Sequence, residues 1–275
     1  MTTRPETPQN TYTHGHHETV LRSHRWRTAE NSAAYLLPHL SPGQSVLDVG
    51  CGPGTITVDL ADRVAGGTVT AVEITAEALK LARDEAARRG TENVRFAVAD
   101  VHALDFPDDT FDVVHAHQVL QHVADPVLAL KEMRRVCKPG GVVAARDSDY
   151  GGFRWFPEVP ALEEWLRLYQ ALATSNGGHP DAGRRLRHWA LAAGFAGDAI
   201  TSSASSWVFA EEPDRRWWAE MWAERTTKSS TATQYVEKGF AYVDDLDTVA
   251  AGWRKWAGQD DGWFNVVHGE IVCVA

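Results

Sequence analysis

Residues 46–54 read Val-Leu-Asp-Val-Gly-Cys-Gly-Pro-Gly, an apolar strand that runs into three glycines spaced by two, with a helical pattern directly after them. A backbone that turns sharply at the end of a strand, and lets a ligand lie against it, needs residues without a Cβ atom. The free N–H groups and the positive end of the helix face the same place. This segment predicts a strand, a turn and a helix that hold a nucleoside.

Apolar runs of strand length recur along the first half of the chain, with helical patterns between them. They cover residues 45–49, 68–73, 94–99, 111–115 and 141–146. Strands that alternate with helices indicate a parallel sheet with right-handed crossovers. Thr75 is a good N-cap and Gly90 a fitting C-terminal residue for one helix, and Asp125-Pro126 opens another.

The second half is rich in tryptophan: residues 149–222 hold seven of the eleven in the chain. Helical patterns near 158–173, 180–193 and 211–226 surround a strand-like run at 200–210, and an alternating stretch at 263–274 predicts a last strand. No repeat or long linker separates the halves. We therefore expect one domain with an embedded cap.

Composition excludes several classes of protein. The formal net charge is −10, which argues against nucleic acid as the main partner. Three cysteines without a C-x-x-C spacing indicate neither a disulfide framework nor a zinc site, which fits a reducing cytoplasm. The first ten residues lack the apolar core of a signal peptide, and no apolar run is long enough for a membrane span. We expect a cytoplasmic protein.

Five motifs carry a family resemblance: VLDVGCGPG at 46–54, TVTAVE ending at Glu73, VRFAVAD ending at Asp100, FDVV at 111–114 and RVCKPGG at 135–141. Together they resemble the class I S-adenosylmethionine-dependent methyltransferases, and within them the ubiquinone/menaquinone-type branch. The match covers residues 46–148 well and thins outside them.

The resemblance implies an α/β fold with a doubly wound, seven-stranded, mostly parallel Rossmann-like sheet whose last strand is antiparallel. It further implies an N-terminal lid helix and a helical insertion near the C-terminus. We expect the lid within residues 1–40 and the methyltransferase domain over 41–275, with the substrate-cap insertions carried by 149–262.

The glycine spacing distinguishes two cofactors. Dinucleotide enzymes use G-x-G-x-x-G, whereas this chain has G-x-G-x-G followed by Thr55. The shorter pattern resembles that of the methyltransferases, in which the turn lies against the methionine part of S-adenosylmethionine. An NAD-dependent oxidoreductase remains an alternative, because both folds bind their cofactor with a glycine-rich turn between a strand and a helix. A non-catalytic cofactor-binding module also stays open, and a methyl-transfer assay would distinguish it.

Two carboxylates follow successive strands. Glu73 stands nineteen residues after Gly54, where either fold places the acceptor of the ribose hydroxyls; the alternative is a surface Glu at a strand end. By resemblance, Asp100 accepts from the adenine amine; the alternative is a turn cap. The same resemblance implies that His117 and Gln118 line the place where the sulfonium methyl points. The predicted cofactor set is Trp26, Arg27, Gly50, Cys51, Gly52, Gly54, Glu73, Ile74, Asp100, Val101, His102, His117 and Gln118.

Residues 12–30 contain four histidines and three arginines. One interpretation is a lid helix with Tyr12 and His14 near the methyl group and Trp26 or Arg27 near the methionine carboxylate, where an arginine would form a bidentate pair. The alternative is an amphipathic helix over the sheet edge. A metal site from His14, His16 and His17 lacks a carboxylate or cysteine at a usual spacing, so we expect no metal. Any homo-oligomer contact is expected through this exposed segment.

His122 is a third candidate catalytic residue beside Tyr12 and His14, expected early in the helix after the fourth strand. The alternative is a structural histidine. Methyl transfer is an in-line displacement, so positioning and desolvation can supply most of the rate without a base.

The aromatic residues Tyr150, Phe153, Trp155 and Phe156 follow the fifth strand, in what Gly151, Gly152 and Pro157 indicate is a loop. They predict a wide apolar acceptor pocket for a hydrophobic small molecule. The resemblance implies that this molecule belongs to secondary metabolism. The chain is also similar to actinobacterial C-methyltransferases of the teleocidin type, which methylate a prenyl group on an indole alkaloid and start a terpene cyclisation. O- or N-methylation of another aromatic or quinone-like metabolite is the alternative.

Overall fold

The computed structural model describes residues 24–275. Tyr12 and His14 therefore lie outside the described residues, as does most of the expected lid segment.

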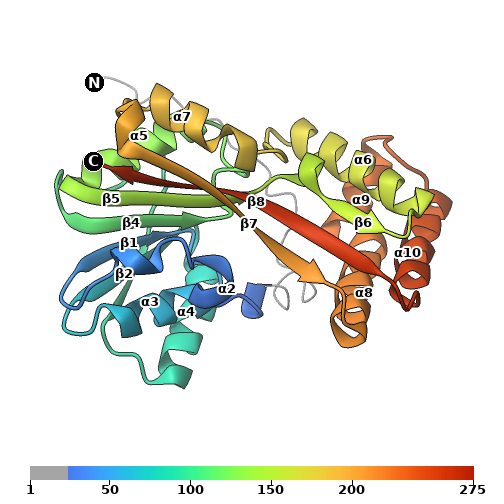
Figure 1. Cartoon of the computed structure of the whole chain (residues 1–275), viewed down its shortest axis with the longest axis horizontal. Helices are drawn as coiled ribbons and strands as arrows, with labels where there is room; N and C mark the ends of the chain where they lie inside the picture. Colours follow the sequence, from blue (N-terminus) through green and yellow to red (C-terminus); the bar gives the residue numbers. More distant parts are fainter. Residues whose placement is uncertain (1–23) are drawn as a thin grey trace.

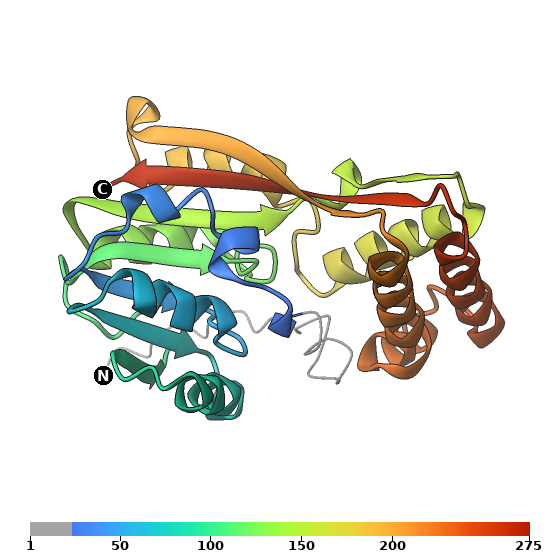
Figure 2. The ribbon, with the colours of Figure 1, turned by 60° about the horizontal axis from the view of Figure 1, so that its bottom comes forward.

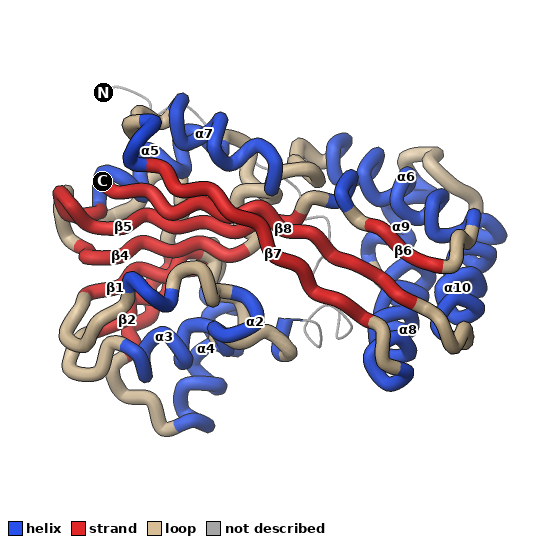
Figure 3. Tube along the Cα trace, viewed as in Figure 1, coloured by secondary structure: helices blue, strands red, loops and turns tan. Residues whose placement is uncertain are grey.

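One eight-stranded sheet runs through the molecule, in the order β3-β2-β1-β4-β5-β8-β6, with β7 paired to β8 (Figures 1 and 3). The predicted strands are confirmed, and the three residues of β6 add an eighth. The strands are β1 Ser45–Val49, β2 Thr68–Glu73, β3 Val94–Val98, β4 Phe111–His117, β5 Cys137–Ser148, β6 Arg154–Phe156, β7 Ile200–Phe209 and β8 Trp263–Val274.

Strands β1 to β5 pair in parallel, whereas β8 runs antiparallel to β5, β6 and β7. The fold is therefore a Rossmann-like α/β sheet with an antiparallel last strand, as expected. The helices are α2 Ala29–Ser32, α3 Thr55–Arg63, α4 Ala76–Arg89, α5 Pro126–Val136, α6 Pro160–Ser175, α7 Leu186–Ala192, α8 Glu212–Lys228, α9 Ser230–Glu237 and α10 Val243–Ala257.

Local chemistry fixes where the helices begin and end. Thr75 caps α4 by accepting a hydrogen bond from the Ala78 N–H, and Gly90 ends it in the left-handed conformation. Asp125 accepts from the Leu128 N–H at the start of α5, whose first residue is Pro126. Both helix starts were predicted from these residues.

Helices cover both faces of the sheet. Alternate residues of β4 point to opposite sides, so Val113 packs with α2 and α3 while Val114 packs with α5 and α7. Because β1, β2 and β4 run parallel, their carboxyl ends lie at the same edge of the sheet. A doubly wound sheet binds its ligand at this edge. No helix among residues 24–275 is long and apolar enough to cross a bilayer.

A cap of α6, α8, α9 and α10 lies beyond this edge, over β6 and the far ends of β7 and β8 (Figure 2). Its core is aromatic: the Trp165 ring lies 4.5 Å from that of Trp222 and 4.8 Å from that of Trp253, both edge-on. Such pairs add about 0.5–1.5 kcal/mol each beyond the burial of their area. Trp165 and Trp218 are buried in this cap, and Trp189 is buried on α7.

Four elements differ from the sequence-based expectation. The run around Trp155 is strand β6, because it pairs with β8 instead of forming a loop. The helical patterns of α9 and α10 were not predicted. His122 lies in a turn before α5, with its N–H bonded to the Val119 carbonyl at 2.9 Å, and not within a helix.

Candidate active site

The glycine turn joins β1 to α3. Gly50, Gly52 and Gly54 all have positive φ, of 66°, 54° and 82°, which only glycine adopts readily. A Cβ atom at Gly54 would lie 2.8 Å from the Ala82 Cα, so α3 and α4 pack closely there. At Gly52 an added Cβ meets nothing within 4 Å. The turn therefore presents backbone to open space, which fits a ligand lying against it. Cys51 is buried within the turn.

Glu73 is held over this turn. Its Oε1 accepts a hydrogen bond of 2.8 Å from the Gly52 N–H, and its Oε2 accepts one of 3.2 Å from the Ile74 N–H. A carboxylate has about four lone-pair positions, so it can also accept from ribose hydroxyls. The neighbouring Ile74 side chain is 61% exposed, which leaves an apolar surface beside the carboxylate.

Asp100 and His102 are joined to each other. Asp100 Oδ1 lies 2.7 Å from His102 Nδ1 and accepts from the His102 N–H at 2.9 Å. Val101 between them is buried. The expected role of Asp100 toward adenine stays a prediction, and its second carboxylate oxygen is the atom available for it.

Gln118 directly follows β4 and joins it to Arg27, β5 and β8. It adopts the left-handed conformation with φ 54°, which is uncommon for a residue with a side chain. Its Oε1 accepts from Arg27 at 2.7 Å, and its amide nitrogen donates to the Ser148 hydroxyl at 3.0 Å and lies 2.9 Å from His268 Nε2. The backbone conformation thus aims this amide at groups from three other segments.

The first described residues run from the turn to the cap. The Thr55 hydroxyl donates to the His24 carbonyl at 3.4 Å. The Trp26 ring packs 5.2 Å from that of Trp207, and the Arg27 guanidinium lies 5.5 Å from the same ring. The expected roles of Trp26 and Arg27 near the methionine carboxylate stay predictions.

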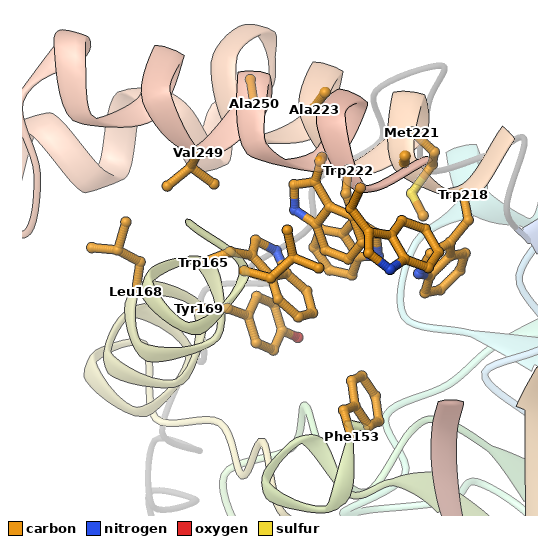
Figure 4. Packing of buried hydrophobic residues seen from close by; sticks show 14 of the residues in the cluster. Phe153, Trp165, Leu168, Tyr169, Trp218, Met221, Trp222, Ala223, Val249 and Ala250 are labelled. Carbon is orange, nitrogen blue, oxygen red and sulfur yellow. The ribbon is translucent and has the colours of Figure 1, made fainter. Parts of the chain in front are cut away.

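A partly open pocket lies between these residues and the cap. Figure 4 shows Trp218 and Trp222 of α8 across from Phe153. The residues around this acceptor cavity are His24, Trp26, Arg27, Gln118, Ser148, Tyr150, Phe153, Trp207, Trp218, Met221, Trp222, Arg225 and Val266.

The structure divides the four aromatic residues that were predicted to bind the acceptor. Tyr150 and Phe153 line the cavity. Trp155 does not: it stacks on Phe264 at 5.7 Å. Phe156 is 54% exposed on β6 and also lies outside the cavity lining. Residues 154–156 were expected to form a loop, but they pair with β8 as a strand. In this strand, neither Trp155 nor Phe156 lines the cavity.

Two titratable groups lie close behind the site. Burial, together with the charges of Arg27 and Arg225, lowers the pKa of His122 to about 3. Burial raises the pKa of Asp147 to about 8, although its carboxylate accepts from the Gln121 N–H. His122 is thus neutral at neutral pH and a weak base. His117 is buried, and desolvation lowers its pKa well below the usual value.

A buried polar group supports Gln118 from beneath. Arg146 lies 3.0 Å from His268 Nδ1 and 3.2 Å from Glu270 Oε1, and the Ser205 hydroxyl also donates to Glu270. Burial lowers the pKa of Arg146 to about 10. Sequence reasoning missed this group; its only signal was polar residues within otherwise apolar β5 and β8.

Sequence reasoning also missed the contribution of α8 to the cavity. Trp218, Met221, Trp222 and Arg225 follow the i, i+3, i+4, i+7 spacing of one helix face. The spacing was visible, but nothing local indicated that this face meets a cavity.

Comparison with known proteins supports the arrangement. The family profile described as "Methyltransferase domain" matches residues 40–199. An uncharacterized methyltransferase of Schizosaccharomyces pombe is 36% identical over 97% of this chain and 97% of its own length. A ubiquinone/menaquinone biosynthesis C-methyltransferase of Idiomarina loihiensis is 36% identical over 56% of this chain and 66% of its own.

Among solved structures, the YcgJ protein of Bacillus subtilis superposes with a TM-score of 0.59 at 20% identity, covering 88% of this chain and 97% of its own, and shows the shared fold. The full-length relative and the family profile together decide the assignment. The chain belongs to the class I S-adenosylmethionine-dependent methyltransferases.

Proposed function

We propose that the protein transfers the methyl group of S-adenosylmethionine to a hydrophobic, largely aromatic small molecule bound in the acceptor cavity. The observation that carries this proposal is the position of Gln118, which directly follows β4 at the carboxyl edge of the sheet and lines the aromatic cavity. Glu73 and the glycine turn would hold the cofactor on one side of it. The rings of Phe153, Trp207 and Trp222 would hold the acceptor on the other.

The residues present fit the cofactor. The open space beside Gly52 would accommodate its methionine part, and the Glu73 carboxylate would accept from its ribose. Arg27 would pair with the methionine carboxylate. The cofactor supplies a methyl group on a cationic sulfur. The protein's part is to align an acceptor atom with that methyl group and to exclude water, which positioning residues do without acid or base.

The narrower proposal, C-methylation of a prenyl group on an indole alkaloid followed by terpene cyclisation, concerns the same cavity. Aromatic faces there would stabilise a carbocation. Partial similarity to a quinone-pathway C-methyltransferase supports carbon as one acceptor atom. O- or N-methylation of another aromatic metabolite is the alternative. Mass spectrometry of the methylated product would distinguish them.

The proposal is tested by transfer of a radiolabelled methyl group to a panel of apolar acceptors, with a cavity-filling variant. Met221→Trp should lower kcat/KM for any acceptor at least tenfold and leave the Kd of S-adenosylhomocysteine unchanged. Leu191→Trp, at a position 46% exposed on α7, is the matched control and should change neither. Methyl transfer that is unaffected by Met221→Trp would contradict the proposed acceptor site.

A further inference from the structure

Strand β7 forms one outer edge of the sheet. Among residues 24–275 it pairs with β8 alone, in a continuous register from Ile200 opposite Cys273 to Phe209 opposite Phe264, with no bulge. In Figure 2 it is the orange strand above the red β8. An edge strand presents a row of unpaired main-chain N–H and C=O groups, which a further strand can bind.

The main-chain groups that face outward belong to the even-numbered residues of β7. The Arg187 guanidinium donates to the Ile200 carbonyl at 2.9 Å, which places this carbonyl on the outer side of the strand. Main-chain groups alternate between the two sides of a strand, so those of Ser202, Ala204 and Ser206 also face outward. The middle of the free edge therefore consists of small residues.

This edge lacks the usual devices that prevent strand pairing. Exposed edge strands are commonly protected by lysine, by proline or by a bulge. Residues 200–209 read ITSSASSWVF and contain neither a charged residue nor a proline. Residues 201–204 are all exposed. Such an edge invites aggregation unless another strand covers it.

The sequence of β7 is complementary to itself. Residues 202–206 read SSASS, which is the same in both directions. Two antiparallel copies related by a two-fold axis at Ala204 would therefore bring serine opposite serine on both sides of the axis. This register also sets outward-facing residues opposite each other, as main-chain pairing requires. A two-fold contact uses the same surface of both copies.

The charges at the two ends of β7 are complementary in the same register. Arg187 lies beside the start of the strand, where it also donates to the Gly197 carbonyl at 3.0 Å. Glu211 follows the end of the strand, and the register places it opposite Gly197 of the second copy. Arg187 and Glu211 are both exposed, and neither forms an ion pair within residues 24–275.

We propose that two copies of the chain pair through β7 about a two-fold axis at Ala204, which joins their sheets into one. A second copy suits this edge because the serine row and the flanking charges both match the same strand reversed. The inference is independent of the proposed function. It places the homo-oligomer contact at β7, apart from the N-terminal segment considered from the sequence.

Sedimentation of the full chain, over a concentration series that reaches about 0.1 mM, tests the proposal. We expect the wild type to form a dimer at the upper end of the series. Ala204→Lys places two like charges at the axis and should yield a monomer with an unchanged far-UV circular dichroism spectrum. Val98→Lys is the matched control: Val98 is 56% exposed on β3, the opposite edge strand, and this variant should still dimerise.

Charge exchange tests the register. Arg187→Glu and Glu211→Arg each set like charges opposite one another twice in a homodimer, so each alone should raise the dimer Kd about tenfold. An equimolar mixture of the two variants restores both attractive pairs and should form a heterodimer with a Kd close to that of the wild type. The two residues flank a strand of ten residues and so stand about 30 Å apart in one copy. Recovery on mixing therefore requires contact between copies.

Three results would each overturn the proposal: a wild type that stays monomeric over the whole series, a dimer that survives Ala204→Lys, or a mixture that shows no recovery. Arg187 also bonds two main-chain carbonyls, so the fold of Arg187→Glu is checked by circular dichroism. If that variant does not fold, the contrast between Ala204→Lys and Val98→Lys still decides.

Discussion

The Gly52 N–H donates a 2.8 Å hydrogen bond to Glu73 Oε1, joining the turn after β1 to the end of β2. The hydrogen bond fixes the carboxylate at the mouth of the turn before any ligand arrives. Pre-placed acceptors bind with less loss of side-chain entropy. Under the proposed function, Glu73 is therefore already in position to accept from the cofactor.

Replacing Glu73 should weaken cofactor binding with little effect on the fold. Hydrogen bonds to a charged acceptor contribute about 1.5–3 kcal/mol. We therefore expect Glu73→Ala to raise the Kd of S-adenosylmethionine about 10- to 150-fold by calorimetry. Glu73→Gln, which keeps one acceptor oxygen, should raise this Kd less than Glu73→Ala does. Glu77→Ala, on the exposed first turn of α4, is the control, and an unchanged Kd in Glu73→Ala would sink the assignment.

Two glycines of the turn should respond differently to alanine. Both substitutions cost about 1–2 kcal/mol for the left-handed backbone. Gly54→Ala also forces Cβ against the backbone of α4, so its Tm should fall further. Gly52→Ala meets no protein atom but enters the proposed ligand space, so its Kd for S-adenosylhomocysteine should rise at least tenfold.

The control for both is Gly66→Ala. Gly66 also has a positive φ, of 83°, and an added Cβ there meets no atom within 4 Å. This variant should lower the free energy of unfolding without changing the Kd. Equal cofactor affinity in Gly52→Ala and Gly66→Ala would place the methionine part elsewhere.

Asp147 should make stability depend on pH. Because its pKa is about 8 when folded and near the ordinary 3.8 when unfolded, the folded protein holds an extra proton between these values. The free energy of unfolding then falls as pH rises from about 4 to about 8, by up to about 1.4 kcal/mol per pH unit. In Asp147→Asn this contribution disappears. Urea midpoints at pH 5, 6, 7 and 8 measure it.

The exposed Asp198→Asn serves as the control and should keep the wild-type slope. If Asp147→Asn and Asp198→Asn show the same slope, the Asp147 carboxyl does not retain its proton in the folded protein.

His122 should not set the pH dependence of turnover. With its pKa at about 3, the imidazole stays neutral from pH 5 to 9 and cannot produce a titration limb there. His122→Gln should retain the shape of the kcat profile, even if its height changes through the contact with Gln121, now 2.9 Å long. A wild-type limb near pH 6.5 that this variant removes would instead identify His122 as a base.

The cofactor side of the site could be predicted from sequence because its signals are local. A strand, three glycines and an acidic residue at the next strand end lie within 28 residues, and their geometry follows from the fold. The helix caps Thr75 and Asp125 were readable for the same reason.

The acceptor side could not be predicted this way, because its groups meet only through tertiary structure. Gln118 bonds to residues 91, 30 and 150 positions away. Whether Phe153 or Trp155 faces the cavity depends on how β6 pairs with β8, which no local pattern states. The contact of Arg225 with Trp222 is local to α8, but the burial of Arg225 depends on how the cap packs.

The most direct test of the account is a crystal structure of the protein with S-adenosylhomocysteine. We predict that the ribose hydroxyls lie within hydrogen-bond distance of Glu73, that the methionine part rests on Gly52, and that the sulfur faces the acceptor cavity beside Gln118. A sulfur that points away from this cavity, or a ligand bound at a different edge of the sheet, would contradict it.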